Sequence, residues 1–290
     1  MGTQGFIAVQ HLEACLLCGA GSDRAAIVHE RPADTLVRCP ECGLLYANPQ
    51  YTEEELRELY ARLYYNEAAL FESDAPERER NERRILYRTV LRDLFAQHPW
   101  LSAPEGAPRR RALSFGCGPG FFLAECRAAG LDCSGIEFSE AAARYAREKL
   151  GLAVRADWSR ALAELPAGYY DLITMWEVIE HLQRPREVVA RLAQALAPGG
   201  VLCVTTPNLL CWRYFLEHGR WFNIRNETHL ALFTRSTLAR LLKECGLPNP
   251  VATVFWGGRP GFTWPASLLE YVGRMAGLGS DVRLYAQKPV

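Results

Sequence analysis

The chain has 290 residues, of which 49% are hydrophobic, so it can bury one large core and a smaller one beside it. Basic and acidic residues balance at 33 each, which argues against a general nucleic-acid binder, since such proteins usually carry an excess of positive charge. The first residues lack the pattern of a signal peptide, and no apolar run reaches the roughly 18 residues of a membrane span. The composition therefore predicts a soluble, cytoplasmic protein without a membrane partner.

Four cysteines near the amino terminus form two close pairs with 20 residues between them. They are Cys15, Cys18, Cys39 and Cys42. Each pair brings two thiolates onto one tight turn, and the glycines that follow, Gly19 and Gly43, permit a left-handed backbone there. Four thiolates complete a tetrahedral Zn²⁺ site and leave no open position, so the pattern predicts a structural zinc ribbon over residues 1–49. Two disulfides or four separate core cysteines are the alternatives.

Residues 50–108 are predicted to form a helical segment followed by a linker. Thr52 starts the sequence Thr-Glu-Glu-Glu, which is typical of a helix capping box ahead of an apolar stripe. A second helix is expected from about Glu77 to Ala96, because its apolar residues recur at helical spacing. The prolines and glycine between Pro99 and Arg110 predict the linker.

Residues 109–290 alternate short apolar runs with helical patterns, which indicates an α/β fold. We expect a Rossmann-like, seven-stranded, mostly parallel sheet with helices on both faces. The expected strands are Ala112–Phe115, Cys133–Glu137, Ala153–Arg155, Leu172–Met175, Val201–Thr205, Val251–Phe255 and Val282–Gln287. The expected helices are Phe121–Ala129, Glu140–Leu150, Arg186–Ala195 and Ser236–Cys245, with Ser139 and Ser236 as N-caps.

The first of these strands runs into a glycine-rich loop and then a helix. The loop reads Gly116-Cys117-Gly118-Pro119-Gly120. The missing side chains let the backbone approach a bound nucleotide. The dinucleotide fingerprint requires a small residue where Phe121 stands, so a ligand without pyrophosphate fits better. The next strand ends at Glu137, about 20 residues beyond the loop, where an acid can accept hydrogen bonds from ribose hydroxyls.

Three further motifs follow the loop and Glu137 in order: Ala156-Asp157-Trp158, the apolar run Asp171–Met175, and the turn Leu196–Gly200. From Ala112 to the carboxyl terminus this order resembles the class I S-adenosylmethionine-dependent methyltransferases. The resemblance implies that the glycine loop holds the methionine part of the cofactor, Glu137 the ribose, and Asp157 the adenine amino group. The residues expected at the cofactor are Gly116, Cys117, Gly118, Gly120, Glu137, Phe138, Asp157, Trp158 and Trp176. Members usually carry an acid where this chain has Ser114.

Other segments resemble particular groups within that family. The run Cys39–Pro49 is similar to the amino-terminal segment of many bacterial methyltransferases. Three segments resemble the ubiquinone-biosynthesis O-methyltransferases: Glu177–Leu182, Thr206-Pro207-Asn208 and the segment around His229. In those enzymes the segment that corresponds to Glu177–Leu182 is associated with Mg²⁺.

Glu177, Glu180 and His181 have helical spacing, so we expect them to share one helical face. There they could hold a divalent cation beside the substrate, with Mg²⁺ as the possible ion, or act as acid and base. A solvated turn paired with Arg184 or Arg186 is the alternative. His229 is a second candidate base.

Aromatic residues are concentrated between Leu209 and Leu232, directly after the fifth strand. They are Trp212, Tyr214, Phe215, Trp221 and Phe222. They could cover the substrate and exclude water, or they could only pack this segment onto the domain.

These features together predict O-methylation of a hydroxyl on a small-molecule acceptor, with His181 or His229 taking the proton. One alternative is N- or C-methylation of a sugar or another metabolite. Another is a non-catalytic module in which the ribbon recruits a protein or nucleic acid. The ribbon loop from Gly19 to Arg38 has few cations for phosphate contacts, which favours a structural role for the ribbon. The sequence carries no indication of the oligomeric state.

Overall fold

The computed structural model describes residues 9–56, 58–59, 77–104, 106–255 and 278–290. Within this part of the chain, a seven-stranded sheet has the order β12-β13-β10-β9-β6-β7-β8. Neighbouring strands from β10 to β8 run parallel, and β13 is antiparallel to both β10 and β12. These strands are β6 (Arg111–Phe115), β7 (Asp132–Ile136), β8 (Ala153–Arg155), β9 (Tyr170–Trp176), β10 (Leu196–Pro207), β12 (Val251–Phe255) and β13 (Asp281–Gln287). The predicted α/β class and mostly parallel sheet are confirmed.

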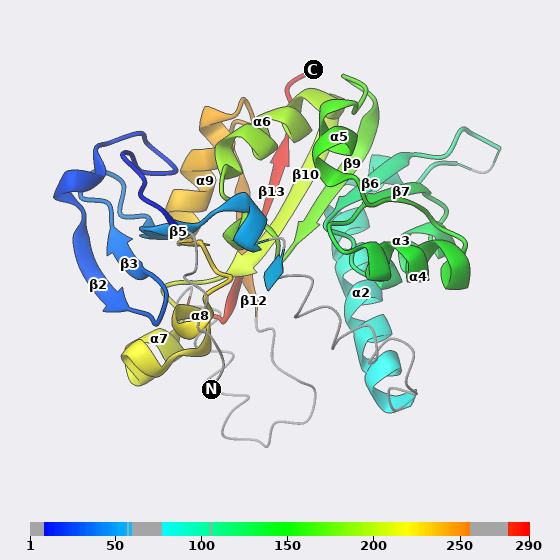
Figure 1. Ribbon diagram of the computed structural model, residues 1–290. Helices are drawn as coiled ribbons and strands as arrows, with labels where there is room; N and C mark the ends of the chain where they lie inside the picture. Colours follow the sequence, from blue (N-terminus) through cyan, green and yellow to red (C-terminus); the bar gives the residue numbers. More distant parts are fainter. Residues whose placement is uncertain (1–8, 57, 60–76, 105, 256–277) are drawn as a thin grey trace.

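Helices cover both faces of this sheet, as Figure 1 shows. On one face, residues of α5, α6 and α9 pack against side chains of β6, β9, β10 and β13. On the other, α2 and α3 pack against the same strands, and α4 packs against α3 and β8. The bounds are α2 (Glu77–Gln97), α3 (Phe121–Ala128), α4 (Glu140–Leu150), α5 (Trp158–Ala163), α6 (Pro185–Ala195) and α9 (Arg235–Glu244).

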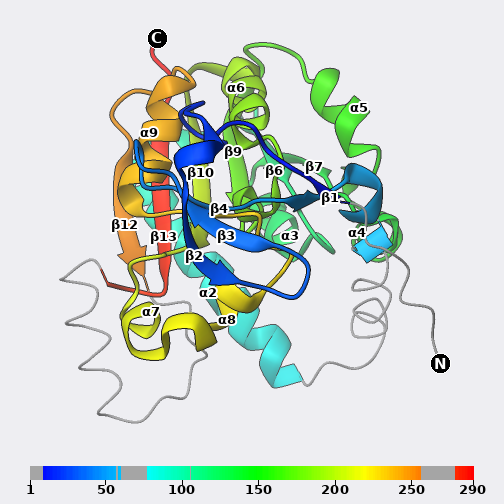
Figure 2. The ribbon, with the colours of Figure 1, turned by 60° about the vertical axis from the view of Figure 1, so that its left-hand side comes forward.

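The ribbon forms a second sheet of four strands, in the order β11-β4-β3-β2. Its strands are β2 (Ala26–Glu30), β3 (Thr35–Arg38), β4 (Leu45–Ala47) and β11 (Ala231–Leu232). Strand β11 comes from the carboxyl-terminal half of the chain and pairs antiparallel with β4. Figure 2 shows the blue strands β2, β3 and β4 in front of the central sheet. The ribbon therefore shares both a sheet and a core with the large domain, because Leu17 and Tyr46 are buried in the same cluster as Ile173 and Leu241.

Short elements complete the described residues. Strands β1 (Val9–Gln10) and β5 (Gln50–Tyr51) form a two-stranded sheet. The remaining helices are α7 (Trp212–Glu217) and α8 (Phe222–Arg225), with 3-10 turns η1 (Ser22–Arg24), η2 (Pro99–Leu101), η3 (Ile179–His181) and η4 (His218–Arg220). None of the helices in this part of the chain is long and apolar enough to cross a membrane.

Side-chain caps explain where two of the described helices begin. Ser139 caps α4, since its side chain accepts a hydrogen bond from the Ala142 N–H at 3.3 Å, as predicted. The prediction of Ser236 as the cap of α9 is wrong. Thr234 is the N-cap and forms a capping box with Thr237, two positions that are both buried. The helical residues 53–56 follow Thr52, whose hydroxyl accepts from the Glu55 N–H at 3.4 Å.

Candidate functional site

A cavity of about 670 Å³ opens at the carboxyl ends of β6, β7 and β9. In α/β folds this end of a parallel sheet is where ligands bind, and the volume falls in the range of small-molecule sites. The lining includes Phe115, Gly116, Gly118, Glu137, Trp176 and His181. The glycine loop, the predicted ribose acid and one candidate base therefore meet in one place.

The three glycines of the loop have different roles, although all of them have a positive φ. A Cβ on Gly118 (φ +54°) would meet no atom of the described residues within 4 Å, so this glycine leaves open space beside the cavity. A Cβ on Gly116 would lie 2.3 Å from Val178 Cγ2. A Cβ on Gly120 would lie 2.6 Å from Leu152 Cδ1. Gly118 is therefore the glycine best placed for close approach of a ligand, whereas Gly120 lets α3 pack onto its neighbours.

Glu137 follows β7 and is buried at the wall of the cavity. Its Oε2 accepts from the Gly118 N–H at 2.6 Å, and its Oε1 accepts from the Ser139 N–H at 2.8 Å. Burial raises the pKa of this carboxyl, while these backbone N–H groups oppose the rise. The carboxylate is thus fixed in direction and tied to the glycine loop, and its remaining lone pairs could accept hydroxyl protons.

Aromatic side chains surround the part of the cavity next to Glu137. Phe138 and Trp158 line it, with ring centroids 6.2 Å apart, and Trp158 also meets Phe115 edge-on at 6.5 Å. Trp176 lies at the end of β9 and packs edge-on against Phe122 at 4.9 Å. These rings offer flat, apolar surfaces of the kind that a nucleoside base packs against. Cys117 lines the cavity as well.

Two of the residues predicted at the cofactor do not line this cavity among the described residues. Gly120 lies at the N-cap of α3, behind the loop. The Asp157 carboxylate is bound to the Arg155 guanidinium, at 2.9 Å, on the protein surface. Its direct contact with a ligand in this cavity stays a prediction. Ser114, at the position where the family usually has an acid, is buried in β6, and its hydroxyl has no hydrogen-bond partner within the part of the chain that the structure describes.

The predicted helical face of Glu177, Glu180 and His181 does not form. Glu177 has a φ of +50°, and only Ile179–His181 forms a 3-10 turn, η3. The backbone leaves β9 here, and the Glu177 N–H donates to the Thr205 carbonyl of β10 at 3.0 Å. Sequence spacing alone could not reveal this, since the neighbouring strand determines the course of the chain.

The two arginines suggested as partners for these carboxylates lie elsewhere in ion pairs. Arg186 binds Glu244, and Arg184 lies 3.6 Å from Glu187. The solvated-turn alternative therefore lacks its expected ion pairs.

Glu177 and Glu180 differ in their surroundings. Glu177 is exposed in the cavity lining, and the protein around it hinders hydration of its charged form. This loss of hydration, followed by the nearby Glu180 carboxyl, raises the pKa of Glu177. Glu180 is fully buried, and its Oε2 accepts from the Thr206 hydroxyl at 2.9 Å, while its Oε1 has no hydrogen-bond partner among the described residues. Burial raises the pKa of Glu180 to about 8, so this carboxyl is mostly protonated at neutral pH.

His181 lies in the cavity wall with its ring orientation fixed. Its Nδ1 lies 2.8 Å from the Thr228 carbonyl oxygen. A carbonyl only accepts, so Nδ1 carries the proton and Nε2 is the acceptor nitrogen of the neutral ring. Burial lowers the pKa of His181 to about 4. The 3.8 Å approach of its Nε2 to Glu180 is therefore not an ion pair at neutral pH.

His229 lies behind His181 and is outside the cavity lining. The two rings meet edge-on with centroids 4.8 Å apart, and His229 Nδ1 donates to the Asn223 carbonyl at 3.2 Å. Burial, followed by the neighbouring His181, lowers the pKa of His229 to about 3. Of the two histidines, only His181 is among the described residues that line the cavity.

Ligand atoms of Glu180, His181 and His229 lie within 4.8 Å of one another and could hold a cation. Glu177 is not part of this group. Mg²⁺ prefers a set of oxygen ligands, whereas this group offers two imidazoles and one carboxylate. Binding of Mg²⁺ therefore stays a prediction.

The four ribbon cysteines converge, as predicted. Their Sγ atoms all lie within 4.8 Å of one another, and the pairs Cys15–Cys42 and Cys18–Cys39 are 3.6 and 3.5 Å apart. A tetrahedron of thiolates around Zn²⁺ has edges of about 3.8 Å, so the cluster has the right size for this ion. It contains no disulfide, because all four cysteines are free.

The aromatic segment after β10 packs instead of lining the cavity. Trp221 is buried with Leu36, Leu45 and Ile224, and Tyr214 packs against this cluster. Phe215 and Phe222 are exposed. None of the five aromatic residues is among the described residues of the cavity lining, so the packing alternative fits the structure better.

Sequence reasoning missed Thr228, whose carbonyl orients His181, and Arg31, whose guanidinium binds the loop that carries Thr228. Arg31 lies 198 residues from His229 in the chain, and no local pattern indicates such a contact.

Comparison with known proteins shows which family the chain belongs to. A family model described as a methyltransferase domain matches residues 54–249. A ubiquinone biosynthesis O-methyltransferase from Aromatoleum aromaticum is 35% identical over 159 residues, which are 51% of this chain and 68% of that protein. The corresponding protein of Methylococcus capsulatus is 33% identical over 172 residues, or 54% of this chain and 73% of that one.

Solved structures of low identity share the fold. A Burkholderia thailandensis 1,6-didemethyltoxoflavin-N1-methyltransferase, solved with its substrate and S-adenosylhomocysteine, has a TM-score of 0.55 at 16% identity and covers 91% of this chain and 100% of its own. An S-adenosylmethionine-dependent methyltransferase from Archaeoglobus fulgidus has a TM-score of 0.53 at 20% identity, covering 72% and 97%. With the family model spanning more than half of its length, this chain belongs to the S-adenosylmethionine-dependent methyltransferases.

Proposed function

We propose that the protein methylates a hydroxyl group of a small-molecule acceptor and that His181 takes the acceptor's proton. The observation that carries this proposal is the position of His181. Its ring lies in the cavity wall, and the Thr228 carbonyl fixes the tautomer in which Nε2 accepts. The curated relatives at 33–35% identity are O-methyltransferases, which supports oxygen as the acceptor atom.

The residues around the cavity fit S-adenosylmethionine. Gly118 leaves open space for close approach, Glu137 presents a fixed carboxylate to ribose hydroxyls, and Phe138 and Trp158 offer flat surfaces to the adenine ring. When bound, the cofactor supplies an electrophilic methyl group. The protein then has two tasks, to align the acceptor oxygen with that methyl and to receive its proton.

Proton transfer would go from the acceptor hydroxyl to Nε2 of His181. The ring is neutral throughout the physiological range, because burial holds its pKa near 4. As the imidazolium forms, the dipole of the protonated Glu180 carboxyl, with an oxygen 3.8 Å from Nε2, can stabilise the new positive charge without any further proton transfer. Mg²⁺ is not part of this proposal.

We also propose that the cysteine cluster holds a structural Zn²⁺. The distances between its sulfur atoms support this, and four thiolates would leave no position for a substrate. The cluster does not contribute to the cavity lining within the described residues, so its role would be to hold the ribbon together.

The direct test of the base is His181→Asn. The asparagine amide can still donate to the Thr228 carbonyl, but it offers no basic nitrogen. We expect kcat to fall by about 100-fold or more, while the Kd of S-adenosylhomocysteine stays within twofold. His218→Asn is the matched control, because His218 is exposed and outside the cavity lining, and should leave both values unchanged.

The outcomes separate the alternatives. An unchanged kcat in His181→Asn would refute the base assignment and favour N- or C-methylation, in which no such base is needed. Absence of S-adenosylhomocysteine binding to the unmodified protein at millimolar concentration would instead favour a non-catalytic binding module.

A further inference from the structure

Arg31 of the ribbon has a buried, charged side chain that contacts the large domain. Arg31 follows β2, and its side chain is only 1% exposed, as is that of Asp34. Its guanidinium forms a two-point ion pair with the Asp34 carboxylate, in which Nη2 lies 2.6 Å from Oδ2. Such a fork fixes the plane and direction of the guanidinium more strictly than a single contact does.

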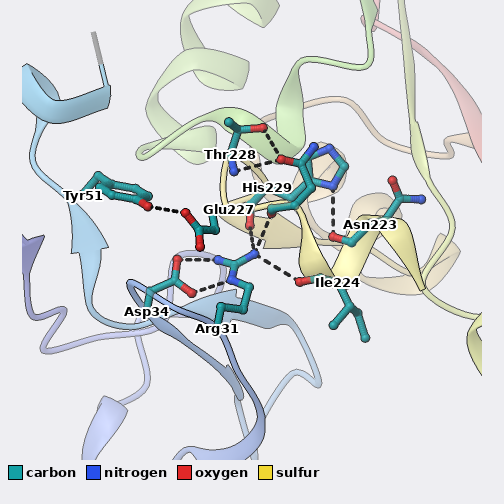
Figure 3. Close-up of polar contacts among 9 residues, drawn as sticks. Arg31, Asp34, Tyr51, Asn223, Ile224, Glu227, Thr228 and His229 are labelled. Carbon is teal, nitrogen blue, oxygen red and sulfur yellow. Dashed lines mark hydrogen bonds and ion pairs between the residues drawn. The ribbon is translucent and has the colours of Figure 1, made fainter. Parts of the chain in front are cut away.

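The other end of the guanidinium binds the loop that follows α8. Its Nη1 donates to the carbonyls of Asn226 at 2.7 Å and His229 at 3.1 Å, with Ile224 at 3.4 Å. Figure 3 shows the Arg31 guanidinium between the Asp34 carboxylate and the backbone of Ile224 and His229. These carbonyls lie where α8 ends, and backbone acceptors at a helix end need partners from elsewhere in the protein. Arg31 thus holds the loop on both sides of Thr228.

Thr228 connects this loop to the proposed base. Its N–H and hydroxyl both donate to Asn226 Oδ1, at 3.1 and 2.9 Å, so its peptide is fixed relative to the carbonyl that Arg31 binds. Its own carbonyl accepts from His181 Nδ1. A continuous set of hydrogen bonds therefore leads from the ribbon through the loop to the ring in the cavity wall.

We propose that Arg31 is a positioning residue for the reaction: by fixing the loop at 226–229, it holds the Thr228 carbonyl where it sets the tautomer and orientation of His181. The ribbon is then a part of the active site, because it fixes the orientation of the His181 ring through Arg31. The inference rests on the function proposed above for His181, but its structural part can be tested separately.

The test uses the full-length, zinc-loaded protein with ¹⁵N-labelled histidine. The variant Arg31→Met/Asp34→Leu removes the buried pair together, so no lone buried charge remains, and buried pairs replaced this way often keep the fold. Arg31→Lys is the second variant, because an ammonium group can stay beside Asp34 but cannot form the fork and bind several carbonyls at once. Arg24→Met/Glu41→Leu is the matched control, since this ribbon pair is exposed.

In the unmodified protein and the control, we expect the His181 ring nitrogens to show one tautomer, protonated at Nδ1. In both Arg31 variants the two ring nitrogens should move toward a mixture of tautomers, and the Nδ1 proton should exchange with water at least 10-fold faster. Once an acceptor has been identified, kcat of both Arg31 variants should be about 10- to 100-fold lower than that of the unmodified protein. The KM of the acceptor and the Kd of S-adenosylhomocysteine should stay within about twofold.

Folded Arg31→Lys protein with the native tautomer and exchange rate would overturn the inference, whatever happens to the double variant. The same result in a folded double variant would overturn it too. A tautomer change in the Arg31 variants together with full activity of His181→Asn would leave the hydrogen-bonded connection standing and remove the base proposal. The two failures are thus distinguishable.

Discussion

Replacing Gly118 by alanine tests whether the glycine loop approaches a ligand. Gly118 has a φ of +54°, and an added Cβ would meet no atom within 4 Å in the part of the chain that the structure describes. The only cost inside the free protein is the left-handed conformation, about 1–2 kcal/mol of unfolding free energy. Because the residue lines the cavity, the new methyl group would stand where the cofactor approaches. We expect the Kd of S-adenosylhomocysteine to rise at least 10-fold, which corresponds to about 1.4 kcal/mol.

Two other glycines supply controls for this experiment. Gly106→Ala places a methyl at φ +81°, also with no atom within 4 Å but outside the cavity lining, and should cost the same stability without changing the Kd. Gly120→Ala brings a Cβ to 2.6 Å from Leu152 Cδ1 and should cost more stability. The assays are urea unfolding and titration calorimetry. A Gly118→Ala protein with the stability of Gly106→Ala and a Kd within twofold of the original would refute the reasoning.

Three further results are expected. Thr206→Val removes the hydroxyl bound to buried Glu180, so urea unfolding at pH 7 should show a loss of about 1–3 kcal/mol; a change below about 0.5 kcal/mol would contradict this. The pKa of His229 in the folded protein, about 3, lies below the unfolded value of 6.5, so its contribution to stability is complete above pH 6.5 and is lost as the pH falls toward 3. Between pH 7 and 5, the free energy of unfolding should therefore fall by about 2 kcal/mol more in the original protein than in His229→Asn. An equal fall in both proteins would rule out a buried neutral ring. Metal analysis should find one zinc ion per chain, and Cys18→Ser should lower both the zinc content and the melting temperature with little effect on S-adenosylhomocysteine binding; a zinc-free protein of unchanged stability would exclude the structural zinc site.

The parts of the fold that the sequence predicted correctly are those that residues a few positions apart determine. Strands β8 and β12 and helix α4 have the predicted bounds, because apolar periodicity and caps such as Ser139 act within a few residues. The cysteine cluster was predictable for the same reason, since each pair lies on one turn and the spacing within a pair is typical of metal-binding cysteines.

What sequence did not predict depends on distant parts of the chain. The run from Glu177 to His181 has helical spacing, but Glu177 hydrogen-bonds to β10 and bends the chain with a φ of +50°, so only a single 3-10 turn follows. The contacts of Arg31 with the loop at 226–229 cross almost 200 residues, as does the pairing of β11 with β4. Such pairings are decided by tertiary packing, to which local propensity contributes little.

Transfer of an isotope-labelled methyl group tests the central claim most directly. The protein is incubated with S-adenosylmethionine carrying a ¹³C methyl and a panel of small molecules that bear hydroxyl or amino groups, and the product atom that carries the label is identified by NMR. The account predicts a labelled methyl on oxygen, formed by the original protein and His218→Asn but lost in His181→Asn. A label on nitrogen or carbon, or the same yield from His181→Asn, would contradict it.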